Sequence, residues 1–575
     1  METTVPSQAD SQAELERTLR SQLATVTGGL APDVYVTAWW DWYLNLAKEP
    51  PKQLQIMQDA LAKAVDNWNF ALKASSGQPL SPGPEDPRYA SGAWSQWPFN
   101  MYAHSYNNLV DWWQQAWTGV AGVAPKNERM LGFVARSALE TLSPSNYLAT
   151  NPELLEQTRL EAGQNLVRGF QNWLDDTERT FEHKAPAGTE RFVVGRDIAA
   201  TPGKIVLRND LVELIQYTPS TESVYAEPIL LIPAWIMKYY ILDLSATNSL
   251  VRYLVSQGHT VFIVSWRNPN ASDRNLGMDD YLKLGIRATI DAVANIVPNR
   301  KIHAVGYCIG GTLLSIGAAL LAAEGDQRLA SMTLLAAQQD FSEPGELSLF
   351  ISPSQLDMLE TVMQKAGVLK SEQMGGAFAM LRSRDLLWTP AVNAYLRGKR
   401  ESLNDMMAWN ADGTRMPCRM HNEYLRGLYL NNALAKGEFL AEGKTVDLSK
   451  ITVPMFMIGT ETDHVAPWQS VYKARGLTRS SDYTFLLTSG GHNAGIVSGP
   501  VHPKRRYRIR SWNNSTDTLP AKEWFDSTPA QAGSWWPVWE QWLVRHSSEK
   551  VAAREPGSQA YPPLADAPGS YVLQK

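Results

Sequence analysis

Apolar side chains recur at spacings of three and four residues through the first third of the chain. This period is typical of amphipathic helices, and it runs through residues 51–73, 102–117 and 152–180. A stretch rich in Pro, Gly and Ser at 75–87 breaks the pattern once. We therefore expect a mainly helical N-terminal domain over residues 31–185. The polar residues 1–30 before it are expected to form a flexible N-terminus.

From about residue 190 the pattern changes to short apolar runs that alternate with helical stretches. The runs are expected to be strands, and they fall at 229–232, 260–264, 302–306, 331–335, 454–458 and 483–487. Helices are expected at 243–257, which ends before Gly258, and at 278–296, which ends before Pro298. Such alternation predicts an α/β fold with a parallel sheet.

The stretch 341–450 interrupts this alternation with Met-rich and aromatic helical sequence. An insertion between two strands of a sheet commonly forms a cap, or lid, over a site. We therefore expect a catalytic domain over residues 186–575, with the cap at about 341–450.

The overall charge argues against a nucleic-acid partner. The chain has 53 basic and 58 acidic side chains and a net charge of −5, and 44% of its residues are hydrophobic, as in a soluble globular protein. The dense basic run at 504–510 fits a solvated face, and the alternative is a landing site for a phosphorylated substrate. The 21 tryptophans cluster at places such as 94–97, 111–113 and 535–542. They fit ordinary packing or, alternatively, contact with a hydrophobic surface.

Cysteine usage and the N-terminus indicate a reducing compartment. Cys308 and Cys418 are the two cysteines, which excludes a disulfide framework. The N-terminal residues are polar and show no signal peptide. The most apolar run, 313–323, is too short for the roughly 20 residues that span a bilayer. No transmembrane segment is expected, and the predicted location is the cytoplasm.

A Gly-flanked cysteine lies between an expected strand and an expected helix. The order Gly306, Cys308, Gly310 is the G-x-S-x-G nucleophile elbow with Cys in place of Ser. The sharp turn needs small residues two positions to either side, and a helix N-terminus favours the thiolate. The sequence therefore predicts Cys308 as a nucleophile on an α/β-hydrolase fold. The alternative is a buried structural cysteine.

In this fold the acid and the histidine follow on loops after later strands. Asp463 follows the strand at 454–458, and His492 follows the strand at 483–487 on a Gly-rich loop. They are the expected catalytic partners of Cys308. Of the nine histidines, His303 lies inside an expected strand and fits the core. His464 is a possible auxiliary proton carrier, and Glu461 is the alternative acid.

An oxyanion hole requires two backbone N–H donors. One comes from the residue after the nucleophile, here Ile309, and the other from the loop after an earlier strand. The loop after 229–232 is suitably placed, and Ile236 is the expected donor. We expect no cofactor and no metal site. A thiolate suits activated acyl donors such as acyl-CoA thioesters, so a thioesterase, a dienelactone-type hydrolase and an acyl-transfer polymerase all stay open.

The wider sequence resembles one family. The sequence GYCIGGT at 306–312 is similar to the Cys-substituted lipase box of the polyhydroxyalkanoate synthases. Further similarities are SPSNY at 143–147, NPE at 151–153, YYILDL at 239–244, SWRNP at 265–269, DF at 340–341, WNAD at 409–412 and PPLADAPG at 562–569. The chain looks most like the class I enzymes. It departs from them at Ala234 and Trp235, beside the expected Ile236 donor.

The resemblance implies a reaction and partners. The substrate would be (R)-3-hydroxyacyl-CoA, which is polymerised into a polyhydroxyalkanoate polyester with release of CoA. Cys308 would carry the growing polyester chain as a thioester, His492 would take its proton and Asp463 would orient His492. The family works as homodimers at polyester granule surfaces. A thioesterase or polyester depolymerase with the same triad is the alternative, and a non-catalytic granule coat is a second. The acyl chain length stays undetermined.

Overall fold

The computed structural model describes residues 31–76, 79–83, 86–513 and 519–575. The chain divides into two compact units. Of the described residues, one unit holds 189–372 and 403–575, and the other, which we call the helical unit, holds those from 31 to 188 together with 373–402. Each is described by itself. The expected flexible N-terminus, 1–30, lies outside the described residues.

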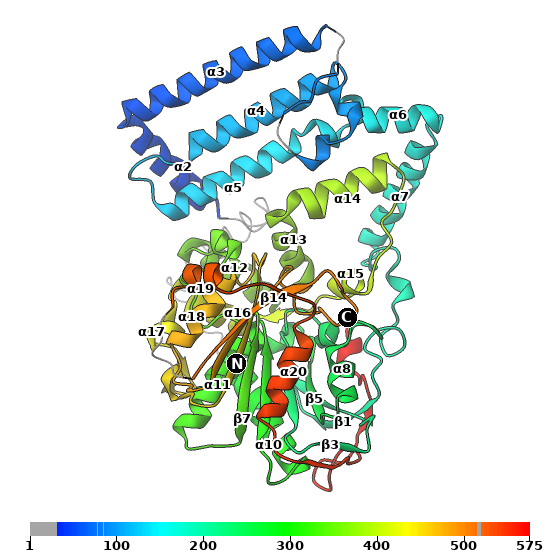
Figure 1. Cartoon of the computed structure of the whole chain (residues 1–575), viewed down its shortest axis with the longest axis vertical. Coiled ribbons are helices and arrows are strands. Elements are labelled where there is room, and N and C mark those ends of the chain that lie inside the picture. Colours follow the sequence, from blue (N-terminus) through cyan, green and yellow to red (C-terminus); the bar gives the residue numbers. More distant parts are fainter. Residues whose placement is uncertain (1–30, 77–78, 84–85, 514–518) are drawn as a thin grey trace, which may run out of the picture. The chain divides into compact units, whose positions relative to one another are not determined.

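Helices build the helical unit (Figure 1). They are α2 (Pro32–Ala47), α3 (Pro50–Ala74), α4 (Phe99–Trp117), α5 (Pro125–Thr141), α6 (Pro152–Leu160) and α7 (Gln164–Phe181). Of these, α3, α4 and α5 lie side by side. Four of the helices begin with proline in the first turn, where the missing N–H costs no hydrogen bond. The expected helical character is confirmed. The single helix expected at 152–180 is wrong, because Ala162 and Gly163 adopt positive φ angles and separate α6 from α7.

The helical unit also contains a segment from much later in the sequence. The π-helical turn η11 (Val392–Leu396) packs along α7. Asn165 and Asn172 donate side-chain hydrogen bonds of 2.9 Å to the carbonyl groups of Leu396 and Ala394. Gly169 lies so close to the Tyr395 carbonyl that a Cβ atom would overlap it. Residues 373–402, which the sequence analysis included in the cap, therefore pack as part of this unit.

The other unit is built on an 11-stranded sheet. Its order is β15-β14-β13-β12-β7-β6-β4-β5-β2-β1-β17. The central strands are parallel and fully or almost fully buried, namely β5 (Val261–Trp266), β4 (Ile229–Ile232), β6 (Ile302–Tyr307), β7 (Leu329–Leu335), β12 (Met455–Thr460) and β13 (Tyr483–Thr488). All six expected strands, and the α/β class, are confirmed.

Antiparallel strands that the sequence analysis did not identify extend this sheet at both edges. They are β2 (Val212–Tyr217), β1 (Gly203–Arg208) and β17 (Ala565–Asp566) on one side, and β14 (Arg506–Trp512) and β15 (Gln531–Ala532) on the other. Most of the basic run at 504–510 therefore lies in β14, the strand next to the edge strand β15.

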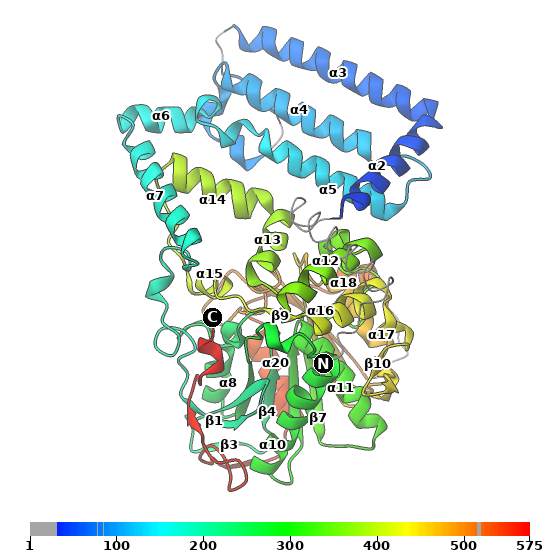
Figure 2. The same ribbon diagram turned by 180° about the vertical axis from the view of Figure 1, so that it is seen from behind.

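Helices cover both faces of the sheet (Figures 1 and 2). On one face α8 (Leu250–Ser256) and the Trp-rich α20 (Trp536–Arg545) pack on the buried side chains of the strands. On the other lie α10 (Ala288–Ile296) and α11 (Ile309–Ala323). The helix expected at 243–257 is wrong in its first half. Asp243 accepts hydrogen bonds from Thr201 and Ser249, and Ser249 then caps α8 at Leu250.

The helix expected at 278–296 is present as α9 (Met278–Asp280), the π-helical η8 (Tyr281–Arg287) and α10 in succession. Between β7 and β12 the chain forms α12 (Pro353–Ala366), α13 (Ser371–Leu381), α15 (Asp405–Asn410), α16 (Cys418–Tyr424) and α17 (Ala433–Lys436). In the part of the chain that the structure describes, no helix is long and apolar enough to cross a bilayer.

Candidate active site

Cys308 occupies the turn between β6 and α11. Its φ of 54° and ψ of −129° lie in a region that side chains other than glycine rarely adopt. The backbone holds this conformation, since Cys308 N–H donates to the Leu335 carbonyl at 2.9 Å and Cys308 C=O accepts from Gly311 N–H at 2.9 Å. The side chain is half-buried at the N-terminus of α11, where the helix dipole favours a negative charge.

Close backbone packing explains the glycines around this turn. A Cβ atom on Gly306 would overlap the Gly311 backbone, and one on Gly310 would overlap the carbonyl oxygen of Ile232. Neither clash involves a flexible side chain that could move aside. Glycine at both positions is therefore what allows β4, β6 and α11 to approach closely enough to form the sharp turn.

Asp463 and His492 lie together, although they follow different strands. The Nδ1 atom of His492 is 2.8 Å from Oδ2 of Asp463, and both side chains are buried. The Asp463 carboxylate also accepts hydrogen bonds from the backbone N–H groups of Val465 and Ala466 and from the Thr460 hydroxyl. These bonds fix the carboxylate, so that the ring of His492 is oriented by it.

The charges of this group support one another. Burial alone would lower the pKa of His492, but the charges of Asp463 and Cys308 and hydrogen bonds to both raise it well above its usual value. Burial would raise the pKa of Asp463, yet the charge and hydrogen bond of His492 bring it below its usual value. The charge of Cys308 is among the causes of the raised pKa of His492, so the thiol lies near the imidazole that Asp463 orients. The arrangement can hold a thiolate beside an imidazolium.

The two expected oxyanion donors lie at the start of α11 and on the loop after β4. Ile309 is the first residue of α11, and within the described residues neither its N–H nor that of Ile236 donates a hydrogen bond. The loop that carries Ile236 is held by Trp266, whose Nε1 donates to the Pro233 carbonyl at 2.9 Å. Trp235 is buried and its ring packs against Tyr281 and Trp266.

The other sequence candidates have different surroundings. Glu461 forms an ion pair with Arg506 of β14 at 2.9 Å. His464 accepts a backbone hydrogen bond from Glu346 N–H at 3.1 Å through its carbonyl. His303 is fully buried between the hydroxyls of Ser331 and Ser547, and burial lowers its pKa to about 3. A buried, hydrogen-bonded His303 fits the core role that the sequence suggested.

Aromatic residues that the sequence analysis did not identify also lie at the site. The Tyr307 ring stacks on His492 with centroids 5.6 Å apart, and its hydroxyl donates to Asn493. Tyr424 and Tyr429 lie in and just after α16, and the charge of Cys308 contributes to their raised pKa values. Tyr307 could have been found from its position beside Cys308. The two cap tyrosines carry no comparable local signal.

The basic run at 504–510 makes local contacts as well as exposing charge. The Arg508 guanidinium stacks over the Phe525 ring at 4.4 Å. Arg505 lies against Gly490 in the loop that leads to His492, where a Cβ atom would come within 2.7 Å of its Nη1 atom. Arg505 therefore packs on the histidine loop, whereas Lys504 forms no ion pair among the described residues.

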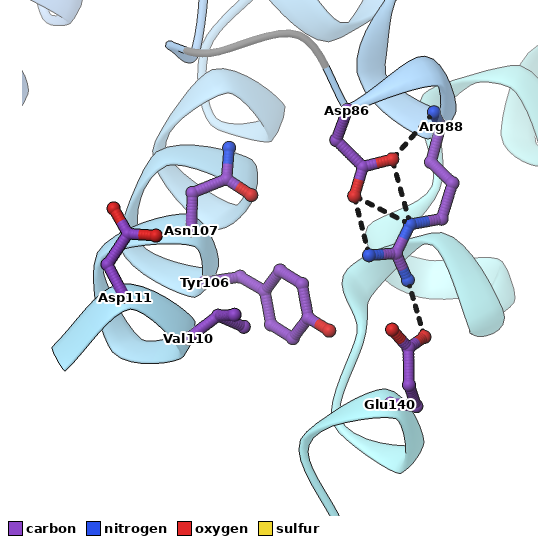
Figure 3. A pocket seen from close by; sticks show the side chains of 7 residues that line it. All are labelled: Asp86, Arg88, Tyr106, Asn107, Val110, Asp111 and Glu140. Atoms are coloured by element: carbon purple, nitrogen blue, oxygen red, sulfur yellow. Dashed lines mark hydrogen bonds and ion pairs between the residues drawn. The ribbon is translucent and has the colours of Figure 1, made fainter. Parts of the chain in front are cut away.

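A separate cavity of about 310 Å³ lies in the helical unit (Figure 3). It is lined by Asp86, Arg88, Tyr106, Asn107, Val110, Asp111 and Glu140. Arg88 binds Asp86 at 2.6 Å and Glu140 at 2.8 Å, so its charge links the segment before α4 to α5. Within the residues that the structure describes, no three His, Cys, Asp or Glu side chains form a metal-binding group.

Comparisons with known proteins agree with this fold. Residues 227–498 match the family model of the alpha/beta hydrolase fold, as the sequence predicted. Residues 85–254 match the model "Poly-beta-hydroxybutyrate polymerase (PhaC) N-terminus", and residues 10–52 match "Poly-beta-hydroxybutyrate polymerase N terminal". Among curated proteins, the chain is 39% identical to a poly(3-hydroxyalkanoate) polymerase of Methylorubrum extorquens over 92% of its own length and 88% of the relative. It is 37% identical to the polymerase subunit PhaC of Rhizobium etli, over 88% of its own length and 79% of the relative. It is 35% identical to the polymerase subunit PhaC of Cupriavidus necator, over 92% of its own length and 90% of the relative.

Proposed function

The chain belongs to the poly(3-hydroxyalkanoate) polymerase family, and from this premise we propose that it polymerises (R)-3-hydroxyacyl-CoA into polyester with release of CoA. The observation that carries the proposal is the buried His492–Asp463 pair, whose histidine feels the charge of Cys308 at a strained turn before a helix. This constellation supports covalent acyl transfer through a thioester.

In the first step the Cys308 thiolate attacks the thioester carbonyl carbon of the substrate. The developing oxyanion is stabilised by the N–H groups of Ile309 and Ile236. The tetrahedral intermediate then collapses, its bond to the CoA sulfur breaks, and the His492 imidazolium gives its proton to that sulfur. The product is free CoA and an acyl group on Cys308. Because one thioester replaces another, the step is close to thermoneutral.

In the second step the 3-hydroxyl of another acyl unit attacks the acyl-Cys308 carbonyl. His492, now neutral, takes the hydroxyl proton, an ester bond forms and the bond to the Cys308 sulfur breaks. Asp463 orients His492 and stabilises its charged form, which its four hydrogen bonds support. Water in place of the hydroxyl would give the thioesterase or depolymerase reaction, so the acceptor decides between the two functions.

The proposed partners are the growing polyester chain, a second copy of this chain in a homodimer, and the surface of cytoplasmic polyester granules. Exposed apolar side chains of the helical unit support a role at a hydrophobic surface. They include Trp39, Trp40 and Tyr43 on α2 and Leu61 and Trp68 on α3. A large exposed apolar area on a folded unit is typical of an interaction site.

Purified protein incubated with (R)-3-hydroxybutyryl-CoA tests the proposal. We expect CoA release together with insoluble polyester, and an acyl adduct on Cys308 in mass spectra of the quenched enzyme. Cys308→Ala should abolish CoA release, polyester formation and the acyl adduct. Cys308→Ser should keep the fold but lose most activity, because a hydroxyl is far harder to deprotonate than a thiol. Free 3-hydroxybutyrate as the sole acyl product would establish the hydrolase instead, and inertness towards every acyl-CoA would favour a granule coat.

A further inference from the structure

The chain between β7 and β12 returns to the active site at the Ile236 loop. The Trp409 Nε1 group donates to the Lys238 carbonyl at 2.8 Å, and the Thr414 hydroxyl donates to the Trp235 carbonyl at 2.5 Å. All four residues are buried. The first part of segment 409–432 is therefore fixed to the loop that carries the second oxyanion donor.

The other end of this segment is fixed beside the nucleophile helix. The side chain of Asn432 accepts from Phe341 N–H at 2.8 Å and donates to Asp340 at 3.0 Å. The chain just before Asp340 is bound to α11 in turn, since the Thr312 hydroxyl donates to the Gln338 carbonyl at 2.8 Å. Between these two attachments, one at the oxyanion loop and the other beside α11, lie α16 and η12 (Leu425–Leu430).

Two buried tyrosines lie in this segment, Tyr424 in α16 and Tyr429 in η12. The Tyr424 and Tyr429 rings have centroids 5.4 Å apart, and Tyr429 also packs against the Phe341 ring at 4.8 Å. Burial is the main reason why the pKa of each hydroxyl is raised, and the charge of Cys308 adds to it in both. The charge of Asp463 adds further at Tyr429. Both hydroxyls are therefore within electrostatic reach of the thiol.

The Tyr429 hydroxyl has an unused proton. Tyr424 O–H donates to the Tyr429 oxygen at a long 3.4 Å. Within the described residues, no acceptor receives the Tyr429 proton itself. A buried donor without an acceptor is unfavourable, and such a group is retained where a ligand supplies the acceptor. Tyr429 also lies in a π-helical turn, a widened helix that is frequent at functional sites.

We infer that the Tyr429 hydroxyl donates a hydrogen bond to the 3-oxygen of the substrate acyl group and so selects 3-hydroxyacyl thioesters over unsubstituted ones. This inference rests on the proposed function. In the proposed mechanism the carbonyl oxygen of the acyl group accepts hydrogen bonds from the N–H groups of Ile309 and Ile236. The 3-oxygen is then the polar atom of the acyl group that still lacks a hydrogen-bond donor. Tyr424 supports Tyr429 from the side away from the substrate.

Tyr429→Phe tests the inference, because it removes the donor and keeps the ring. The rate of acyl-Cys308 formation is measured by rapid quench and mass spectrometry, with (R)-3-hydroxybutyryl-CoA and with butyryl-CoA. We expect kcat/KM for the hydroxylated substrate to fall about tenfold, the size of one lost hydrogen bond, while butyryl-CoA reacts as before. The selectivity ratio, rather than the activity alone, is the readout.

Tyr424→Phe is the matched control, since it removes a tyrosine hydroxyl from the same pair without removing the proposed donor. It should keep the ratio of the two rates within about twofold, as the loss of a long hydrogen bond predicts. An equal fall for both substrates in Tyr429→Phe, at an unchanged melting temperature, would overturn the inference, and so would no change for either. If the wild-type protein acylates Cys308 with neither thioester, the proposed function itself fails.

Discussion

The charge state of His492 depends on one carboxylate. Asp463 accepts its hydrogen bond at 2.8 Å and is the largest of the influences that raise the pKa of His492 against the opposing effect of burial. A raised pKa keeps the imidazolium present to higher pH. Because that cation protonates the departing CoA in the proposed mechanism, activity should be lost as the pH rises through the pKa of His492.

Asp463→Asn should therefore move the alkaline limb of the pH profile of kcat/KM to lower pH. Removal of the carboxylate charge leaves burial to lower the pKa of His492, so the imidazolium disappears earlier. The rate at the optimum should also fall by about 10²-fold or more, the size of a general acid–base contribution. Glu461→Gln is the control, because Glu461 pairs with Arg506 and should leave the limb in place. An unshifted limb in Asp463→Asn would mean that another group sets it.

Residues at strand ends were predictable, whereas residues on the cap were not. Cys308, Asp463 and His492 each follow a buried apolar strand, and the parallel sheet brings those strand ends to one edge. Tyr429 lies instead within a helical, generally apolar stretch, where a tyrosine resembles any core aromatic. Its position near Cys308 depends on hydrogen bonds at residues 409, 414 and 432, which link segments distant in sequence.

Among the elements, the turn between β6 and α11 is the most tightly constrained. Gly310→Ala places a Cβ atom on the Ile232 carbonyl. We expect a loss of about 1–3 kcal/mol or more in the free energy of unfolding, the usual cost of overpacking, measured by urea denaturation. Gly132→Ala on α5 is the control. Its Cβ atom would meet nothing within 4 Å, so it should stabilise the helix by about 0.5–1 kcal/mol. Equal effects at both sites would contradict the packing argument.

The differences between expected and observed elements have local causes. Strands with buried runs, such as β4 and β12, were found because both faces are apolar. The edge-region strand β14 was not, because its arginines conceal the buried positions Tyr507 and Trp512. The N-terminal half of the helix expected at 243–257 does not form, since the buried Asp243 carboxylate binds Thr201 and Ser249 and fixes a different backbone.

At the scale of the whole molecule, helix α3 exposes a stripe of apolar side chains to solvent. Six side chains at spacings of three and four are each at least half exposed, namely Leu54, Met57, Leu61, Val65, Trp68 and Leu72. The face of α3 that packs on α4 holds more polar residues, including Asn67 and Lys63. An outward apolar stripe is the reverse of the usual pattern for a surface helix and supports binding to a polyester surface.

The double variant Leu61→Glu/Trp68→Glu should bind polyester granules more than tenfold more weakly, because each buried apolar side chain contributes about 1.5–3 kcal/mol. Co-sedimentation with granules measures it. CoA release from soluble substrate in the first turnovers should be unchanged. Gln55→Glu adds charge at an exposed position of the same helix outside the stripe and should bind normally. Undiminished binding by the double variant would place the contact elsewhere.

The discontinuous helical unit limits how this protein can be dissected. The chain leaves the sheet-containing unit at about residue 373 and rejoins it at 403. A truncation that removes residues 1–188 would therefore leave the 373–402 segment of the helical unit behind without its partners. The carbonyl groups of Ala394 and Leu396 would lose their donors Asn172 and Asn165, and Arg400 would lose Asp175. Such a fragment would contain polar groups without hydrogen-bond partners. If it were inactive, the loss of activity would reflect the unpaired residues 373–402 as much as the catalytic side chains. A clean excision needs two cuts and a new linker.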